Sequence, residues 1–107
     1  MNSITISGKV AGRDAQQRQA GSETVTYFSV SDSKKMKGEW VTTFYDVSIW
    51  GKRGEALLPI IRKGTNVVVV GELQPPVVKG EKVYLSVRCN EINVIREAVA
   101  VEEHIPF

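Results

Sequence analysis

Residues 40–50 read WVTTFYDVSIW, and apolar and polar side chains alternate from Tyr45 to Ile49. A period of two indicates a β-strand with one buried face. The predicted core face consists of Tyr45, Val47 and Ile49. The opposite face carries Phe44 and Trp50 among polar residues, a mixture that neither a core nor a plain solvent face would need. We therefore expect this strand to contribute to both the core and a binding surface.

The chain on either side of this stretch contains further strands and one helix. Alternation and β-branched residues predict strands at 4–10, 24–31, 40–50, 65–73 and 83–89, with 90–95 completing the edge. Helical spacing predicts a short helix within 51–64, which Pro59 should keep brief or irregular. The polar residues 11–22 are interpreted as a connection, and the basic segment 32–39 as a hairpin tip.

Five strands with a helix between the third and the fourth match one known all-β architecture. This element order is that of the five-stranded Greek-key OB-fold barrel, which binds oligonucleotides and oligosaccharides. The pattern alone also fits other small β-barrels. We predict an OB-fold domain at 1–95 and a short acidic tail at 96–107.

The bulk properties exclude several classes of protein. The 107 residues suit one compact domain, with no apolar run near 18 residues and no secretory signal, so we expect a cytoplasmic protein without a membrane partner. Cys89 is the only cysteine and His104 the only histidine, which excludes an internal disulfide and a Cys/His metal site. Cys89 is predicted to be a buried structural thiol. We expect no cofactor.

Charge is distributed unevenly along the chain. Residues 1–90 carry 13 Lys and Arg against 8 Asp and Glu, whereas residues 91–107 carry one against four. A basic body with an acidic tail suits a domain that binds a polyanion, although ordinary scatter of charges would also produce this asymmetry.

Aromatic residues interleaved with basic ones suggest a nucleic-acid surface. The candidate stacking residues are Trp50, Phe44, Trp40 and Tyr84. The candidate phosphate contacts are Lys9, Arg13, Arg18, Lys34, Lys35, Lys37, Lys52 and Arg88. In the alternative, Phe44 and Trp50 pack beneath the hairpin or against a neighbouring subunit, and any single lysine is only a solvated surface charge.

Catalysis has little support in the sequence. Acid–base and nucleophilic mechanisms need converging groups, which one histidine, one cysteine and scattered carboxylates do not supply. Asp14, Asp32 and Asp46 are separated by strands and loops, so we interpret them as surface or turn residues. Gly8-Lys9 and Gly51-Lys52 lack the upstream glycine of a P-loop. The chain is therefore predicted not to be an enzyme.

Several segments, taken in order, resemble the bacterial single-stranded DNA-binding protein family. They are 2–10 (NSITISGKV), 14–18, 28–30, 47–52 (VSIWGK), 62–65, the positions Val67, Val69, Gly71 and Leu73, and the final Ile105-Pro106-Phe107. The resemblance implies a nucleoid-associated homotetramer that binds single-stranded DNA without sequence preference. It also implies protection of that DNA in replication, repair and recombination. In this family the terminal tip, here Ile105, Pro106 and Phe107, recruits replication and repair proteins.

The chain departs from the family pattern in several places. Phe44 and Trp50 occupy the places of stacking aromatics with the two residue types exchanged. Asp46 stands where a basic residue is common. The hairpin 74–82 lacks an aromatic residue that many members carry. Val68 and Val70 make both faces of their strand apolar, which we interpret as a subunit interface.

The tail is much shorter than is usual in the family, so its reach should be limited. Phe107 can present its carboxylate to a partner only if it is the true C-terminus. Two other interpretations stay open. One is an adaptor that acts mainly through the tip and binds DNA weakly, and the other is a primosome-type or RNA-binding OB-fold protein.

Overall fold

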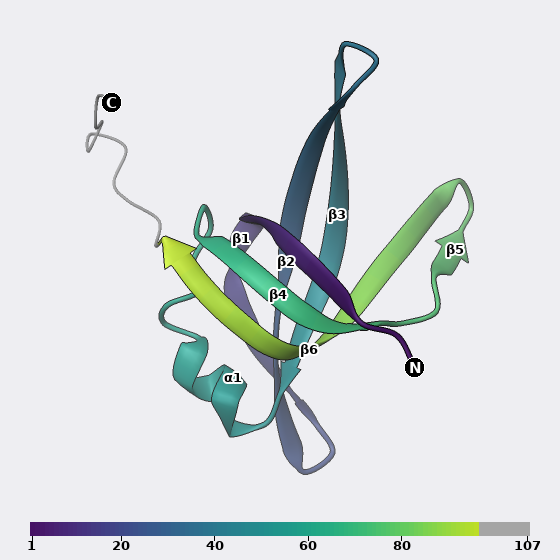
Figure 1. Ribbon diagram of the computed structural model, residues 1–107. Helices are drawn as coiled ribbons and strands as arrows, with labels where there is room; N and C mark the ends of the chain where they lie inside the picture. Colours follow the sequence, from purple (N-terminus) through teal and green to yellow (C-terminus); the bar gives the residue numbers. More distant parts are fainter. Residues whose placement is uncertain (97–107) are drawn as a thin grey trace.

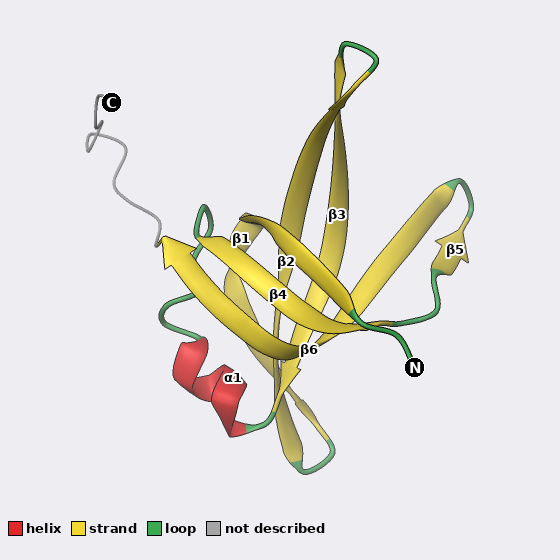
Figure 2. Cartoon of the chain, viewed as in Figure 1, coloured by secondary structure: helices red, strands yellow, loops and turns green. Residues whose placement is uncertain are grey.

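The computed structural model describes residues 1–96, and the predicted tail and its Ile105-Pro106-Phe107 tip lie outside the described residues. The chain forms six strands and one helix (Figure 1; Figure 2). In chain order they are β1 (Ile4–Ala20), β2 (Glu23–Met36), β3 (Glu39–Trp50), α1 (Lys52–Leu57), β4 (Asn66–Leu73), β5 (Val77–Lys79) and β6 (Lys82–Arg96).

The strands form one sheet that closes on itself. Hydrogen-bonded neighbours follow the order β3-β2-β1-β4-β6-β5, and β3 also pairs with β6. The β3–β6 pairing is parallel, whereas the other pairs are antiparallel. Five long strands therefore form a barrel, and in chain order α1 lies between the third and the fourth of them, as predicted.

The barrel interior is filled mainly by β-branched side chains. Alternating residues of five strands are buried, among them Val10, Val30, Val47, Ile49, Val69 and Val87. Each fully buried side chain of this kind contributes about 1.5 to 3 kcal/mol relative to its exposed state. Tyr45 packs against this cluster, so the core face predicted for β3 is confirmed.

Two segments predicted to be loops are strands. Residues 11–20 extend β1, with a register shift between Ala11 and Gln16, and they pair with β2. Residues 32–36 extend β2 into a two-stranded ribbon with β3. The loop prediction was wrong because it rested on the polar and charged side chains of these residues. Such side chains also suit strands that lie largely in solvent and are held by backbone hydrogen bonds rather than by burial.

The turn of this ribbon has a defined geometry. Met36 pairs with Glu39, so only Lys37 and Gly38 connect the strands, with φ angles of 50° and 83°. Positive φ at both positions is the requirement of a type I′ turn, whose twist matches the flanking strands. The basic tip is therefore an ordered continuation of the sheet.

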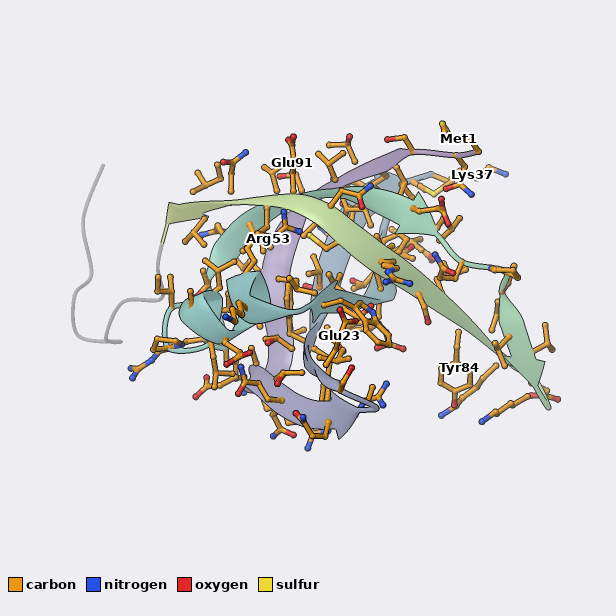
Figure 3. The ribbon with its side chains drawn as sticks, turned by 90° about the horizontal axis from the view of Figure 1, so that it is seen from below. Met1, Glu23, Lys37, Arg53, Tyr84 and Glu91 are labelled. Carbon is orange, nitrogen blue, oxygen red and sulfur yellow. The ribbon has the colours of Figure 1, made fainter. Side chains whose placement is uncertain are left out.

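Helix α1 is short and anchored to the barrel. It ends at Leu57, before Pro59, in keeping with the brief helix predicted. Gly54 is buried against Thr26 of β2. The Arg53 guanidinium donates hydrogen bonds to the backbone oxygens of Cys89, at 3.2 Å, and Asn90 (Figure 3). The helix thereby connects β2 to the middle of β6. The short strand β5 was not predicted.

Candidate nucleic-acid interface

The outward face of β3 continues onto both neighbouring strands. Cross-strand pairing places Asp46 opposite Ser29 of β2 and, on the other side, opposite Ser86 of β6. Paired residues point to the same side of a sheet. Alternate residues of β2, β3 and β6 therefore form one continuous surface, which we call the open face. Its members are Tyr27, Ser29 and Ser31 of β2, Phe44, Asp46, Ser48 and Trp50 of β3, and Tyr84, Ser86 and Arg88 of β6.

Two aromatic side chains share a hollow on the open face. Phe44 is 59% exposed and Tyr84 is 41% exposed. They line one hollow of about 370 Å³ together with Asp46, Lys82, Val83 and Leu85. Large exposed rings beside a lysine provide a surface on which flat aromatic ligands can stack. Tyr84 belongs to the arm that β5 forms with β6, where it pairs with Val77 (Figure 3).

Trp50 is arranged differently from Phe44. It is half-buried at the end of β3, and the guanidinium carbon of Arg88 lies 4.7 Å from its ring centroid. A second pair lies on β1 and β2, where the Arg18 guanidinium is 6.0 Å from the Tyr27 ring. One arginine–aromatic pair therefore lies on the open face and the second joins its Tyr27 to Arg18 of β1, and each pair contributes about 0.5 to 2 kcal/mol.

Tyr27 was missing from the candidates that the sequence provided. It lies on the open face opposite Ser48, and its hydroxyl donates to Gln16 Oε1 at 3.2 Å. The alternation of residues 24–31 predicts that Tyr27 points to the opposite face of the strand from Phe28, which lies in the core. That alternation was the available indication, and Tyr27 joins the candidate site.

Trp40 and Lys9 belong to a separate hollow. Trp40 is 70% exposed and pairs with Lys35, near the turn of the ribbon. It lines this hollow with Lys9, Asp32 and Asn66, together with neighbouring serines of β1 and β2. The two candidates are thus brought together in a hollow other than that of Phe44 and Tyr84.

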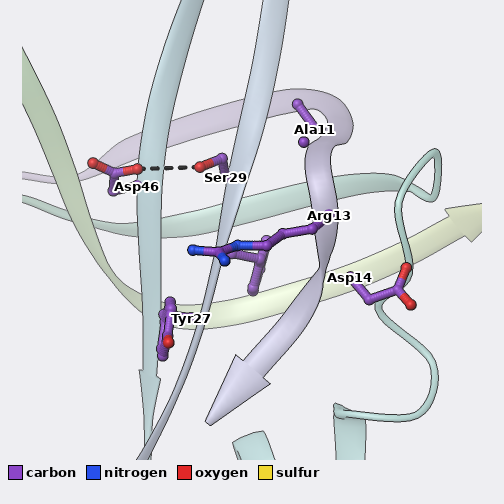
Figure 4. Close-up of a pocket in the computed structure, with 8 residues that line it drawn as sticks. Ala11, Arg13, Asp14, Tyr27, Ser29 and Asp46 are labelled. Carbon is purple, nitrogen blue, oxygen red and sulfur yellow. Dashed lines mark hydrogen bonds between the residues drawn. The ribbon is translucent and has the colours of Figure 1, made fainter. Parts of the chain in front are cut away.

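Four of the remaining candidates are exposed lysines that line none of these hollows. Lys34, Lys35 and Lys37 lie along the ribbon and at its turn, and Lys52 lies at the start of α1. Arg13 lines a further hollow of about 300 Å³ with Tyr27, Ser29 and Asp46 (Figure 4).

The three aspartates that the sequence placed at the surface have different surroundings. Asp14 is exposed and accepts a hydrogen bond from the Lys63 backbone N–H at 2.8 Å, and in Figure 4 it points away from Asp46. Asp32 is half-buried beside Trp40. Asp46 is exposed in the open face. Within the described residues, no group of three or more His, Cys, Asp or Glu side chains could hold a metal ion.

Cys89 is buried in β6, as predicted. Burial raises the pKa of its thiol, and the nearby Arg53 charge opposes this effect without cancelling it. A raised pKa keeps the sulfur protonated and unreactive at neutral pH, which is consistent with a structural role. No helix in residues 1–96 is long and apolar enough to cross a membrane.

The chain is similar to known proteins over most of its length. A family model described as "Single-strand binding protein family" matches residues 1–95. A single-stranded DNA-binding protein of Borreliella burgdorferi is 31% identical over 78 residues, which cover 69% of this chain and 52% of that protein. One of Treponema pallidum is 30% identical over 79 residues, which cover 69% of this chain and 44% of that protein. The chain thus matches about half the length of these relatives.

A solved structure has the same fold. It is the second single-stranded DNA-binding protein (SSBb) of Mycobacterium smegmatis, which matches with a TM-score of 0.66 and 20% sequence identity over 87% of each chain. The prediction of an all-β OB-fold barrel with one helix between its third and fourth long strands is confirmed.

Proposed function

Because this chain belongs to the single-strand binding protein family, we propose that it binds single-stranded DNA along the open face. The ligand is the one for which the Borreliella and Treponema relatives are named. The proposed role is binding without catalysis and without a cofactor. It also agrees with the basic balance of residues 1–90, because a polyanion is attracted to excess positive charge.

One observation carries the proposal, namely that Phe44 and Tyr84 share a hollow with Lys82. Soluble proteins rarely expose large rings side by side without a use for them. A base stacked on an exposed ring contributes about 1 to 3 kcal/mol, and every base has a face that can stack. A lysine at the rim of the same hollow can neutralise the phosphate that accompanies the base.

Residues on the open face and on the strands beside it extend this binding surface. Arg88 and Arg18 already lie over aromatic rings, so each can contact a phosphate without first being ordered. Trp40 and Lys9 offer a second place for a base and its phosphate near the ribbon. The lysines of the ribbon continue the basic surface. Together these groups support binding over several nucleotides.

Finer aspects of the proposal follow from the sequence resemblance. We propose a homotetramer in which half-exposed Val68 and Val70 of β4 lie in a subunit interface. The cellular role would be protection of single-stranded DNA in replication, repair and recombination, in the cytoplasm at the nucleoid. Ile105, Pro106 and Phe107 would recruit partner proteins, and deleting them should abolish partner capture without reducing DNA affinity.

The test is a titration of thymine oligonucleotide against intrinsic tryptophan fluorescence, with the oligomer mass measured alongside. We expect quenching, and an affinity that falls as salt rises. A Phe44→Ala, Trp50→Ala double variant should fold but bind far more weakly. Full affinity in this variant would refute the stacking surface. Preference for RNA over DNA in direct competition would refute the proposed ligand.

A further inference from the structure

Asp46 lies at the meeting point of the hollows on the open face. It lines the hollow of Phe44 and Tyr84, the hollow of Arg13, and a third one with Arg18 and Ser86. A surface built only to bind a polyanion would place no carboxylate there, because that carboxylate repels phosphate. The position of Asp46 therefore calls for a ligand group other than phosphate.

The Asp46 carboxylate has capacity to accept further hydrogen bonds. Ser29 Oγ donates to its Oδ1 at 3.2 Å, and Oδ2 has no hydrogen-bond partner among the described residues (Figure 4). An ionised carboxylate is only an acceptor, and its two oxygens can receive two parallel N–H groups. The exposed carboxylate can therefore accept two adjacent donors from a ligand.

We propose that Asp46 gives the open face a preference for guanine, an inference that rests on the proposed binding of single-stranded DNA. The Watson–Crick edge of guanine presents N1–H and the 2-amino group side by side, which match the two carboxylate oxygens. Cytosine and adenine present one amino group beside an acceptor nitrogen. Thymine presents one N–H between two carbonyl oxygens, which a carboxylate repels.

The geometry of β3 supports this assignment. Phe44 and Asp46 are alternate residues on one face of a strand, so their Cα atoms lie about 7 Å apart. A base stacked on Phe44 or Tyr84 lies in the hollow that Asp46 also lines, so one edge of the base can face the carboxylate. Arg13 extends into the neighbouring hollow, which Asp46 also lines, and its positive charge offsets part of the repulsion between the carboxylate and a phosphate.

The experiment compares three oligonucleotides of equal length. One contains only thymine, the second carries isolated guanines spaced among thymines so that they cannot form quadruplexes, and the third carries hypoxanthine at the same positions. Hypoxanthine keeps N1–H but lacks the 2-amino group. Affinity is measured by tryptophan quenching for the wild type and for Asp46→Asn, Asp46→Ala and Glu81→Gln. The last variant removes an exposed carboxylate from the β5–β6 turn and serves as the charge-matched control.

We expect the wild type to bind the guanine oligonucleotide roughly tenfold more tightly than the thymine one, with hypoxanthine between them. Both Asp46 variants should lose this preference and bind thymine at least as tightly as the wild type, while Glu81→Gln keeps the preference. Equal wild-type affinities, or an undiminished preference in both Asp46 variants, would overturn the role of Asp46 while leaving the proposed function intact. Failure of the wild type to bind any oligonucleotide would overturn both.

Discussion

The guanidinium carbon of Arg88 lies 4.7 Å from the centroid of the Trp50 ring. The two residues come from β6 and β3, whose parallel pairing closes the barrel. Arg88 pairs with Ser48, which is two residues before Trp50 on the same face of β3. One face of the half-buried Trp50 ring is thus covered by a cation, whereas Phe44 is largely exposed. The two aromatic residues, both predicted from the sequence to stack bases, therefore have different surroundings.

Arg88→Met should weaken binding to a thymine oligonucleotide and reduce its salt dependence. The side chain remains long enough to cover Trp50, but the charge near the phosphates is lost. For a single strand, loss of one phosphate contact lowers the slope of log affinity against log salt by about 0.7. Titrations at several salt concentrations measure this slope. Arg88→Lys should restore the slope, and an unchanged slope in Arg88→Met would mean that Arg88 does not contact DNA.

Phe44→Ala should reduce affinity for the same oligonucleotide about 5- to 160-fold, the loss expected for one stacked base. Its side chain is 59% exposed, so the midpoint of urea unfolding should change little. Phe44→Trp keeps an aromatic ring and should retain affinity. Tight binding by folded Phe44→Ala would place the DNA elsewhere on the barrel.

The two faces of β3 could be predicted because the alternation of residues 40–50 is a local property of the chain. Burial of Val47 and Ile49 and exposure of Phe44 both follow from it. The order of the long strands and the helix was predictable for the same reason, since each element carries its own periodicity.

Relationships between distant strands could not be predicted in this way. Arg88 meets Trp50 only because β3 and β6 pair in a particular register, which neither segment encodes by itself. The extension of β1 through residues 11–20 likewise depends on pairing with β2 across a register shift. Sequence pattern therefore found the aromatic and basic residues but not their grouping into hollows.

Cys89 should resist modification in the folded protein. Burial raises its thiol pKa, so at pH 8 a thiol-specific disulfide reagent should react at least about tenfold more slowly with the native chain than with the chain in urea. The raised pKa also sets the direction of a pH effect. The unfolded chain loses this proton first, so the thiol's contribution to the free energy of unfolding should be fully present below the ordinary thiol pKa of about 8.5 and be lost as pH rises toward the folded value.

Cys89→Val tests this interpretation because valine fills similar space and has no proton to lose. Its free energy of unfolding, measured in urea from pH 7 to pH 10, should fall less steeply above pH 8.5 than that of the wild type. Parallel curves for the two proteins would assign the alkaline loss of stability to other groups.

Gly54→Ala should destabilise the fold, although alanine normally favours a helix over glycine by about 1 kcal/mol. A Cβ atom at position 54 would lie 2.5 Å from Thr26 Oγ1 and 2.9 Å from the Ile49 backbone oxygen. The helix would have to move off β2, at a cost of about 1 to 3 kcal/mol, typical of overpacking. Urea unfolding measures this loss. Glu55→Ala, an exposed change in the same helix, should stay within about 0.5 kcal/mol of the wild type. A gain in stability for Gly54→Ala would mean that α1 is not held against Thr26 in solution.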